Sequence, residues 1–439
     1  MRRPDNRLGK SQGIAEGRGR STFQPTDVQH TRQTQRVGQN RSPDFEDQPM
    51  ATTKTLALSL LVTASISAQQ PTQTTNGSDH PTFVSVAAGS GHFCGVDSDG
   101  DINCWGDGRW GQLGNGSVES SDAVPVRVAS LQRFRQVVAG ATHTCALTTD
   151  GYAYCWGSDA SGVMGDATVR ESCQGVACIT RPMPVAIGLR FDSLTAGFEH
   201  TCGLWKGRAY CWGRSDAGQL GAVATPRSCH GIACSRRPVL VSDSIAFTSI
   251  SARGTHTCAI ASQSLYCWGD NGYHQLGADP QRGSTVRPER IFADTGFVQV
   301  SAGGLYSCAV TTNGVVVCWG TNDNGRMGAA DAAVTRAAVA PPTGERFTHV
   351  SVGGTHTCAL TSTGSAYCWG LNIDRRLGGP SNAQCGNFEC SATPVRVALD
   401  KALVDVAAGS SRTCALGRDG TIYCWGGLSG SALATGIPK

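Results

Sequence analysis

Twenty cysteines carry most of the chemistry that this sequence offers. The tripeptide Cys-Trp-Gly occurs seven times, and another cysteine stands nine or ten residues before each copy. Three further pairs have four residues between their cysteines. An even count at regular spacing is typical of disulfides in an exported chain. We predict ten disulfides, which join Cys94 to Cys104, Cys145 to Cys155, Cys173 to Cys178, Cys202 to Cys211, Cys229 to Cys234, Cys258 to Cys267, Cys308 to Cys318, Cys358 to Cys368, Cys385 to Cys390 and Cys414 to Cys424.

Metal binding is the competing use of these thiols. Two of the short pairs, at residues 173/178 and 229/234, lie in consecutive repeats and could together form one four-thiolate zinc site. The third short pair, at 385/390, would then have no partner pair, so we favour disulfides. Five repeated histidines stand two residues before a cysteine, which indicates a hydrogen-bonded structural role rather than a ligand or a base. They are His92, His143, His200, His256 and His356. We predict no metal and no cofactor.

Recognisable catalytic motifs are missing from the repeats. There is no HExxH, no nucleophile elbow and no P-loop. Residues 106–111 match GxGxxG by letters, yet no helix follows and the glycines recur in every repeat. The sequence therefore favours a protein that is not an enzyme, although an active site assembled across repeats stays open.

Each cysteine pair of the Cys-Trp-Gly type must be held by a β-hairpin. In five copies the cysteines are ten apart and the midpoint falls on a three-residue loop that ends in glycine, such as residues 98–100. Glycine at the third position of such a loop adopts the left-handed conformation that this hairpin requires. In the other two copies the spacing of nine leaves a two-residue loop. Both versions place the cysteines opposite each other, with Cα atoms expected at ~4.5–5.5 Å.

The repeats determine the fold class. Successive first cysteines are 50 to 57 residues apart, and alternation gives each hairpin two apolar faces. One further strand precedes each hairpin, and another begins near runs such as Pro125 to Val128 and Pro394 to Val397. Sheets that are buried on both faces pack side by side around an axis. We predict an all-β, seven-bladed propeller of four-stranded antiparallel blades, stapled by disulfides, over residues 83–439.

The fullest repeat contains Ala-Gly140, His143-Thr-Cys-Ala-Leu147, Asp-Gly151 and Tyr-Cys-Trp-Gly157, and Gly-Gln-Leu-Gly occurs at 111–114 and 218–221. This pattern resembles the repeat of the regulator of chromosome condensation family over about residues 83–434. The resemblance implies a seven-bladed propeller. It implies less about function, because the superfamily includes a nuclear guanine-nucleotide exchange factor, a plant ultraviolet photoreceptor and a secreted bacterial β-lactamase inhibitor. The cysteine-rich version is similar to exported bacterial members.

Several positions depart from the repeat. Arg253 stands where six copies have glycine, and Tyr306 and Arg412 replace the recurring histidine. The last repeat lacks an obvious fourth strand, so we expect a weak closure between the first and last blades. The photoreceptor motif Gly-Trp-Arg-His-Thr is absent, and the seven Cys-Trp-Gly tryptophans are expected to be core residues.

Charge and the N-terminal segment bear on location. The chain has 37 Lys+Arg and 33 Asp+Glu, but residues 1–68 hold ten basic and six acidic groups, so the remaining 371 are neutral. A neutral body provides no field that would collect nucleic acid. Residues 1–49 are expected to be a disordered extension, or to precede a true translation start at Met50. Residues 50–68 resemble a signal peptide cleaved after Ala68, with an apolar run too short to span a membrane. Residues 69–82 would be a linker.

We therefore expect a secreted, periplasmic or cell-surface binding module, monomeric and with a protein partner. Its binding face would carry the non-repeated residues Arg109, Trp110, Tyr273 and Phe388, on the rim that also bears the three short cysteine loops, with Trp205 on the opposite rim. Two alternatives stay open: an intracellular exchange factor or chromatin binder, and a propeller lyase or hydrolase.

Overall fold

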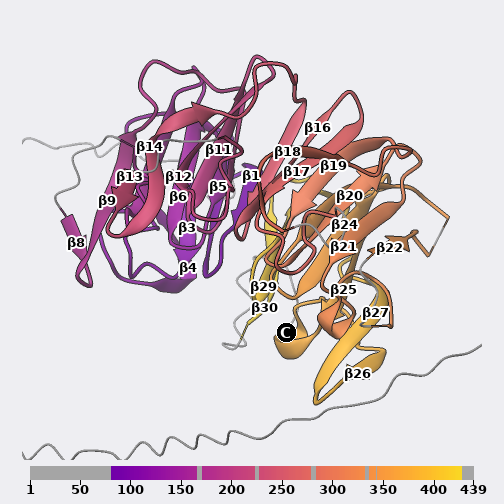
Figure 1. The fold of residues 1–439 in the computed structure, drawn as a ribbon. Helices are drawn as coiled ribbons and strands as arrows, with labels where there is room; N and C mark the ends of the chain where they lie inside the picture. The colour runs from indigo at the N-terminus through magenta and orange to yellow at the C-terminus, as the bar shows by residue number, and fades with distance from the viewer. Residues whose placement is uncertain are drawn as a thin grey trace, which may run out of the picture. The chain divides into compact units, whose positions relative to one another are not determined.

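The computed structural model describes residues 81–165, 171–222, 227–277, 283–331, 336–342 and 344–427. Within this part of the chain the protein is a seven-bladed β-propeller (Figure 1). The expected N-terminal extension, the signal peptide and nearly all of the linker lie outside the described residues. Among the described residues, no helix has the length and apolarity needed to cross a membrane.

Each blade begins with an innermost strand that lines the ring axis. These seven strands are β1 (Phe83–Ala88), β5 (Phe134–Ala139), β10 (Ser193–Ala196), β15 (Ser249–Arg253), β19 (Phe297–Ala302), β23 (Phe347–Val352) and β28 (Leu403–Ala408). The second strands are β2 (His92–Asp97), β6 (His143–Thr148), β11 (His200–Trp205), β16 (His256–Ala261), β20 (Tyr306–Thr311), β24 (His356–Thr361) and β29 (Arg412–Gly417).

The outer strands complete the blades. The third strands are β3 (Ile102–Gly106), β7 (Ala153–Ser158), β12 (Arg208–Arg214), β17 (Ser264–Gly269), β21 (Val316–Gly320), β25 (Ala366–Leu371) and β30 (Ile422–Gly426). The fourth strands are β4 (Ser121–Arg127), β9 (Val176–Pro184), β14 (Ile232–Leu240), β18 (Thr285–Ile291), β22 (Arg336–Val339) and β27 (Phe388–Arg396). Two single-turn 3-10 helices, η1 (Asp323–Gly325) and η2 (Ile373–Arg375), follow the third strands of blades five and six.

Three blades have a fifth strand that the sequence reasoning did not foresee. The short strands β8 (Glu171–Cys173), β13 (Arg227–Cys229) and β26 (Ala383–Cys385) pair antiparallel with the beginning of β9, β14 and β27. The predicted cysteine loops are therefore hairpins that extend the fourth strand of blades two, three and six. For this reason the fourth strand of blade six begins at Phe388, six residues before the predicted Pro394.

The disulfide prediction is confirmed for the described chain. All twenty cysteines are paired as expected, and none is free. The hairpin cysteines face each other in register, as Cys94 does with Cys104. Their Cα atoms lie 4.1 Å apart in that pair, slightly closer than the expected range. The pairs at 173/178 and 229/234 each close their own hairpin, which favours disulfides over a shared zinc site.

The ring closes although the last blade has only three strands in the described region. Each innermost strand contacts the innermost strands of both neighbouring blades, and β1 contacts β28 and β29 across the seam. Phe93 and Trp105 of the first blade pack there against Leu416 and Ile422 of the last. The closure expected to be weak is thus formed by the inner strands.

The recurring histidines and tryptophans join neighbouring blades. The Gln112 carbonyl of blade one accepts hydrogen bonds from the Thr144 hydroxyl at 2.7 Å and from the Trp156 indole at 2.9 Å, both in blade two. The Thr144 hydroxyl uses its hydrogen for this carbonyl, so it accepts a hydrogen bond from Nε2–H of His92 at 2.8 Å. The same contact joins His143 to Thr201, His200 to Thr257, His256 to Ser307 and His356 to Thr413.

These histidines are therefore structural, as predicted. All five are almost fully buried. Burial lowers the pKa of His143, His200 and His356 to about 3, and that of His92 and His256 to about 4. In blade five Tyr306 takes over the role, since its hydroxyl donates to the His356 carbonyl at 2.8 Å. The seven Cys-Trp-Gly tryptophans are 0 to 8% exposed, which confirms them as core residues.

Candidate functional site

The strand order defines two rims of the propeller. Because the blades are antiparallel, the connections between first and second strands and between third and fourth strands share one rim. The cysteine hairpins belong to it, since Cys178 pairs with Ser158, the last residue of β7. We call this rim, with the hairpins at 171–178, 227–234 and 383–390, the Cys-hairpin face. The turns between second and third strands form the opposite rim, the turn face.

Trp110 and Tyr273 occupy the same repeat position on the Cys-hairpin face, in blades one and four. The backbone N–H of Trp110 donates to the side chain of Gln112 at 2.8 Å, and that of Tyr273 donates to Gln275 at 2.8 Å. Both glutamines are fully buried, so each turn is anchored to the blade beneath it. Tyr273 is 52% exposed and Trp110 is half-buried. Two aromatic side chains thus stand on turns of fixed conformation.

Arg109 and Phe388 lie on the same face. The Arg109 guanidinium donates to both carboxylate oxygens of Asp107 at 2.9 Å and is exposed. Phe388 is 51% exposed and faces Cys385 in the third cysteine hairpin. Trp205, by contrast, ends β11 at the turn face and contacts Lys206 and Tyr210. The four predicted residues therefore share a face, but they are distributed over blades one, four and six rather than gathered in one pocket.

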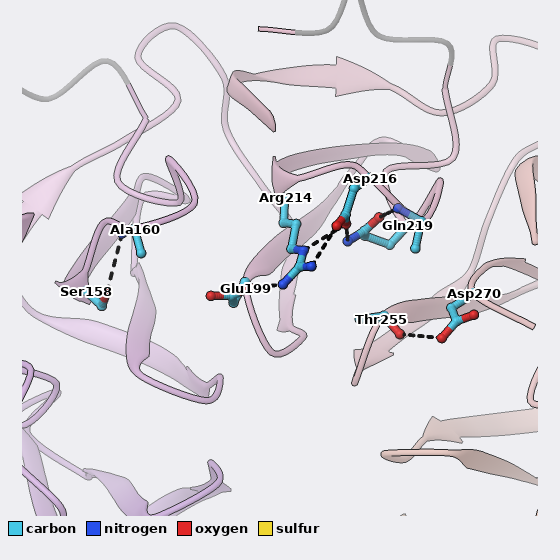
Figure 2. A network of polar contacts seen from close by, with 9 residues as sticks. Ser158, Ala160, Glu199, Arg214, Asp216, Gln219, Thr255 and Asp270 are labelled. Carbon is cyan, nitrogen blue, oxygen red and sulfur yellow. Dashed lines mark hydrogen bonds and ion pairs between the residues drawn. The ribbon is translucent and has the colours of Figure 1, made fainter. Parts of the chain in front are cut away.

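A polar network on this face was not found from the sequence (Figure 2). Arg214 lies between two carboxylates, with Nη1 2.5 Å from Glu199 and Nη2 2.6 Å from Asp216. The hydrogen bond to Asp216 is the main cause that raises the pKa of Arg214. Nearby, the Thr255 hydroxyl donates to Asp270 at 3.0 Å. A cavity of about 160 Å³ lies here between blades two, three and four.

In the sequence, this network is marked by the variable residue that follows Cys-Trp-Gly. That position holds Arg214 in blade three and Asp270 in blade four, and it differs in most other copies. The residue before the recurring histidine, Glu199 or Thr255, supplies the partner. The two positions are adjacent only because the first-to-second and third-to-fourth connections meet at one rim.

The ring axis holds a second region, lined by the innermost strands. A cavity of about 300 Å³ there is bounded by Ser251, Ser301 and Ser351, by His349 and Asp405, and by Arg253. Nε2 of His349 lies 3.4 Å from Asp405. Arg253, the residue that replaces the repeated glycine, reaches from blade four across the axis. Its Nη1 donates to the Ala408 carbonyl of blade seven at 2.8 Å, and its Nη2 lies 3.4 Å from the Gly89 carbonyl of blade one.

Comparisons with known proteins agree with this architecture. The sequence matches the RCC1-like domain over residues 53–398 and the regulator of chromosome condensation (RCC1) repeat over residues 403–429. The chain belongs to the RCC1-like domain family. Within this family it is 31% identical over 258 residues to the ultraviolet-B receptor UVR8 of Arabidopsis thaliana, covering 56% of this chain and 55% of the receptor.

Other members have different activities. The guanine nucleotide exchange factor SRM1 of Saccharomyces cerevisiae is 28% identical over 249 residues, covering 52% of this chain and 51% of that protein. The chain thus spans about half the length of these relatives.

Solved structures share the RCC1-like fold. Human WBSCR16 superposes with a TM-score of 0.66 at 22% identity, covering 77% of this chain and 88% of its own. Yeast RCC1 (Prp20), solved bound to Kap60, superposes with a TM-score of 0.63 at 22% identity, covering 74% and 78%. At these identities the likeness concerns the fold alone.

Proposed function

We propose that this RCC1-like propeller is an exported module that binds a protein partner through its Cys-hairpin face. The observation that carries the proposal is the pair Trp110 and Tyr273, placed at one repeat position on turns that buried glutamines hold in place. Phe388 adds a third aromatic side chain, 51% exposed, on a hairpin closed by a disulfide.

Aromatic side chains on rigid turns are suited to recognition for two reasons. They bury a large area on contact, and little conformational freedom is lost because the turn is already ordered. Truncation of such an anchor typically costs about 2 kcal/mol of binding free energy, or about a 30-fold weaker Kd. Protein binding also has a precedent in the fold, since yeast RCC1 was solved bound to Kap60.

Export is supported by the ten disulfides of the described chain, which favour an oxidising compartment. They also weigh against the intracellular exchange-factor alternative, which would require reduced thiols. The apolar run within residues 50–68 supplies a signal-peptide pattern, so the mature protein should start near Gln69. N-terminal sequencing of the native protein tests this. A mature N-terminus upstream of residue 50 on cytoplasmic protein would remove the export proposal.

Partner binding is tested with matched variants on the two faces. Pull-downs from the native secretome should recover the partner with wild-type protein and lose it with Trp110→Ala and Tyr273→Ala. Trp205→Ala and Tyr152→Ala are the matched controls, because Trp205 and the 40% exposed Tyr152 belong to the turn face. Circular dichroism should confirm that all four variants are folded.

The Kd of the recovered partner for each variant then decides between the faces. A Kd about 30-fold weaker for the Cys-hairpin variants alone would support the proposal. If those variants keep every partner while the controls lose them, the binding face is the turn face.

A further inference from the structure

The axial cavity contains four hydroxyl groups at equivalent positions of consecutive inner strands. Each oxygen accepts the backbone N–H of the next blade, at 2.9 to 3.0 Å. The pairs are Thr195 with Ala252, Ser251 with Ala302, Ser301 with Val352 and Ser351 with Ala408. All four residues line the cavity. The oxygens are thus held in place as acceptors, and their hydrogens have no acceptor within the described residues.

A cation lines the same cavity. Arg253 is partly buried and is one of the residues that bound the cavity. Its partners are two backbone carbonyls, and no carboxylate pairs with it among the described residues. Desolvation lowers its pKa to about 10, so it is still charged at neutral pH. A buried charge without a counter-ion is unfavourable, and an anion in the cavity would relieve that cost.

Among the described residues, Asp405 is the only carboxylate that lines the cavity, and it is already engaged. Asp405 lies beside His349 and accepts its neighbour's backbone N–H, at Val406, at 2.8 Å. Burial raises the pKa of Asp405. The cavity therefore combines a guanidinium and four hydroxyl donors with one carboxyl group, which lies beside His349. Donors of this kind bind oxyanions.

We propose that the axial cavity binds a small oxyanion, a carboxylate or phosphate group, with Arg253 as the cationic anchor and the hydroxyls of Ser251, Ser301 and Ser351 as further donors. Arg253 ends β15 at the Cys-hairpin rim, so the ligand would enter from the turn face. This site is separate from the proposed protein-binding face, and its test needs no protein partner.

The test is calorimetric titration of the full-length chain with sodium acetate and with sodium phosphate at constant ionic strength, against sodium chloride. We expect saturable one-site binding of at least one oxyanion and none of chloride. Arg253→Gly, which restores the repeat residue, should weaken binding at least 10-fold. Ser301→Ala should weaken it several-fold. Arg375→Gly, the same change at an exposed arginine, should have no effect.

Two results would overturn the proposal. One is the lack of saturable binding by either oxyanion. The other is an affinity that Arg253→Gly leaves unchanged. If Arg253→Gly does not fold, Arg253→Lys and Ser301→Ala decide, because an oxyanion site must respond to both a displaced charge and a lost donor. Unchanged affinity in these two variants would equally overturn it. A preference between acetate and phosphate would identify the ligand class.

Discussion

Acidification should weaken this propeller well before its surface carboxylates titrate. Five buried, neutral histidines hold neighbouring blades together through hydrogen bonds, and burial depresses their folded-state pKa to about 3 or 4. The unfolded chain has the ordinary value of about 6.5. As the pH falls through 6.5, the unfolded chain takes up protons and the folded chain does not. The histidines therefore leave the free energy of unfolding at its full value above about pH 6.5, and lower it progressively as the pH falls below that value.

The size of the effect follows from linkage. Between pH 7 and pH 5 each histidine with a folded pKa of about 4 lowers the free energy of unfolding by roughly 2 kcal/mol. Five histidines together therefore lower it by on the order of 10 kcal/mol. Asp159 and Asp405 should make the folded protein more stable as the pH falls, because burial raises their pKa values. They are only two groups, so the effect of the five histidines should dominate.

The assay is guanidinium unfolding at pH 7, 6 and 5 without reductant, followed by tryptophan fluorescence. His200→Gln should reduce the change in the free energy of unfolding between pH 7 and pH 5 by about a fifth, because one of the five histidines is removed. The glutamine amide can still donate to Thr257, but it does not titrate. His230→Gln, at an exposed histidine, should leave it unchanged. A free energy of unfolding that stays level from pH 7 to pH 5, or a His200→Gln protein with the wild-type pH dependence, would refute the reasoning.

Three further predictions concern single features. Gly114→Ala should lower the free energy of unfolding in denaturant by about 2 to 3 kcal/mol, because Gly114 has φ +71° and the new Cβ would lie 2.5 Å from the Trp156 indole nitrogen. Gly175→Ala, at φ +83° with nothing within 4 Å of the new Cβ, should cost about 1 kcal/mol. Equal losses in the two variants would contradict the packing argument. Asp159→Asn should cost about 2 kcal/mol, because it leaves Arg236 of the next blade, 2.7 Å from the buried Asp159 carboxylate, without its charged partner. A loss no larger than that of Asp101→Asn, whose ion pairs are exposed on the arginine side, would be the contrary result. Thiol titration of the denatured, unreduced native protein should find almost no free cysteine, and several free thiols would disprove the disulfide assignment.

The parts of the fold that the sequence predicted are those set by local spacing. The cysteines at 94 and 104 had to face each other because their loop length and its final glycine leave one hairpin register. The recurrence of that hairpin then predicted the ring. Placement of Trp110 and Tyr273 on one rim also followed, since strand direction alone decides which connections share a rim.

What the sequence could not predict depends on distances across blades. Arg253 stood out as a departure from glycine, yet its carbonyl partners are 155 and 164 residues away in the chain. Only the diameter of the closed ring brings them within reach. The pairing of Arg214 with Glu199 likewise depends on how the loop between the first and second strands of blade three meets the end of its third strand. The spacing of the repeats does not indicate this contact.

Every disulfide of the described chain lies within one blade and joins cysteines at most ten positions apart. Twenty cysteines drawn at random could pair in on the order of 10⁸ to 10⁹ ways. Here the correct partner is the next cysteine along the chain, so each bond can form before the following blade has been synthesised. If the protein is exported as we propose, we expect its oxidation to need little isomerase correction. Because each disulfide lies within one blade, a whole blade can be duplicated or deleted in evolution without leaving a cysteine unpaired.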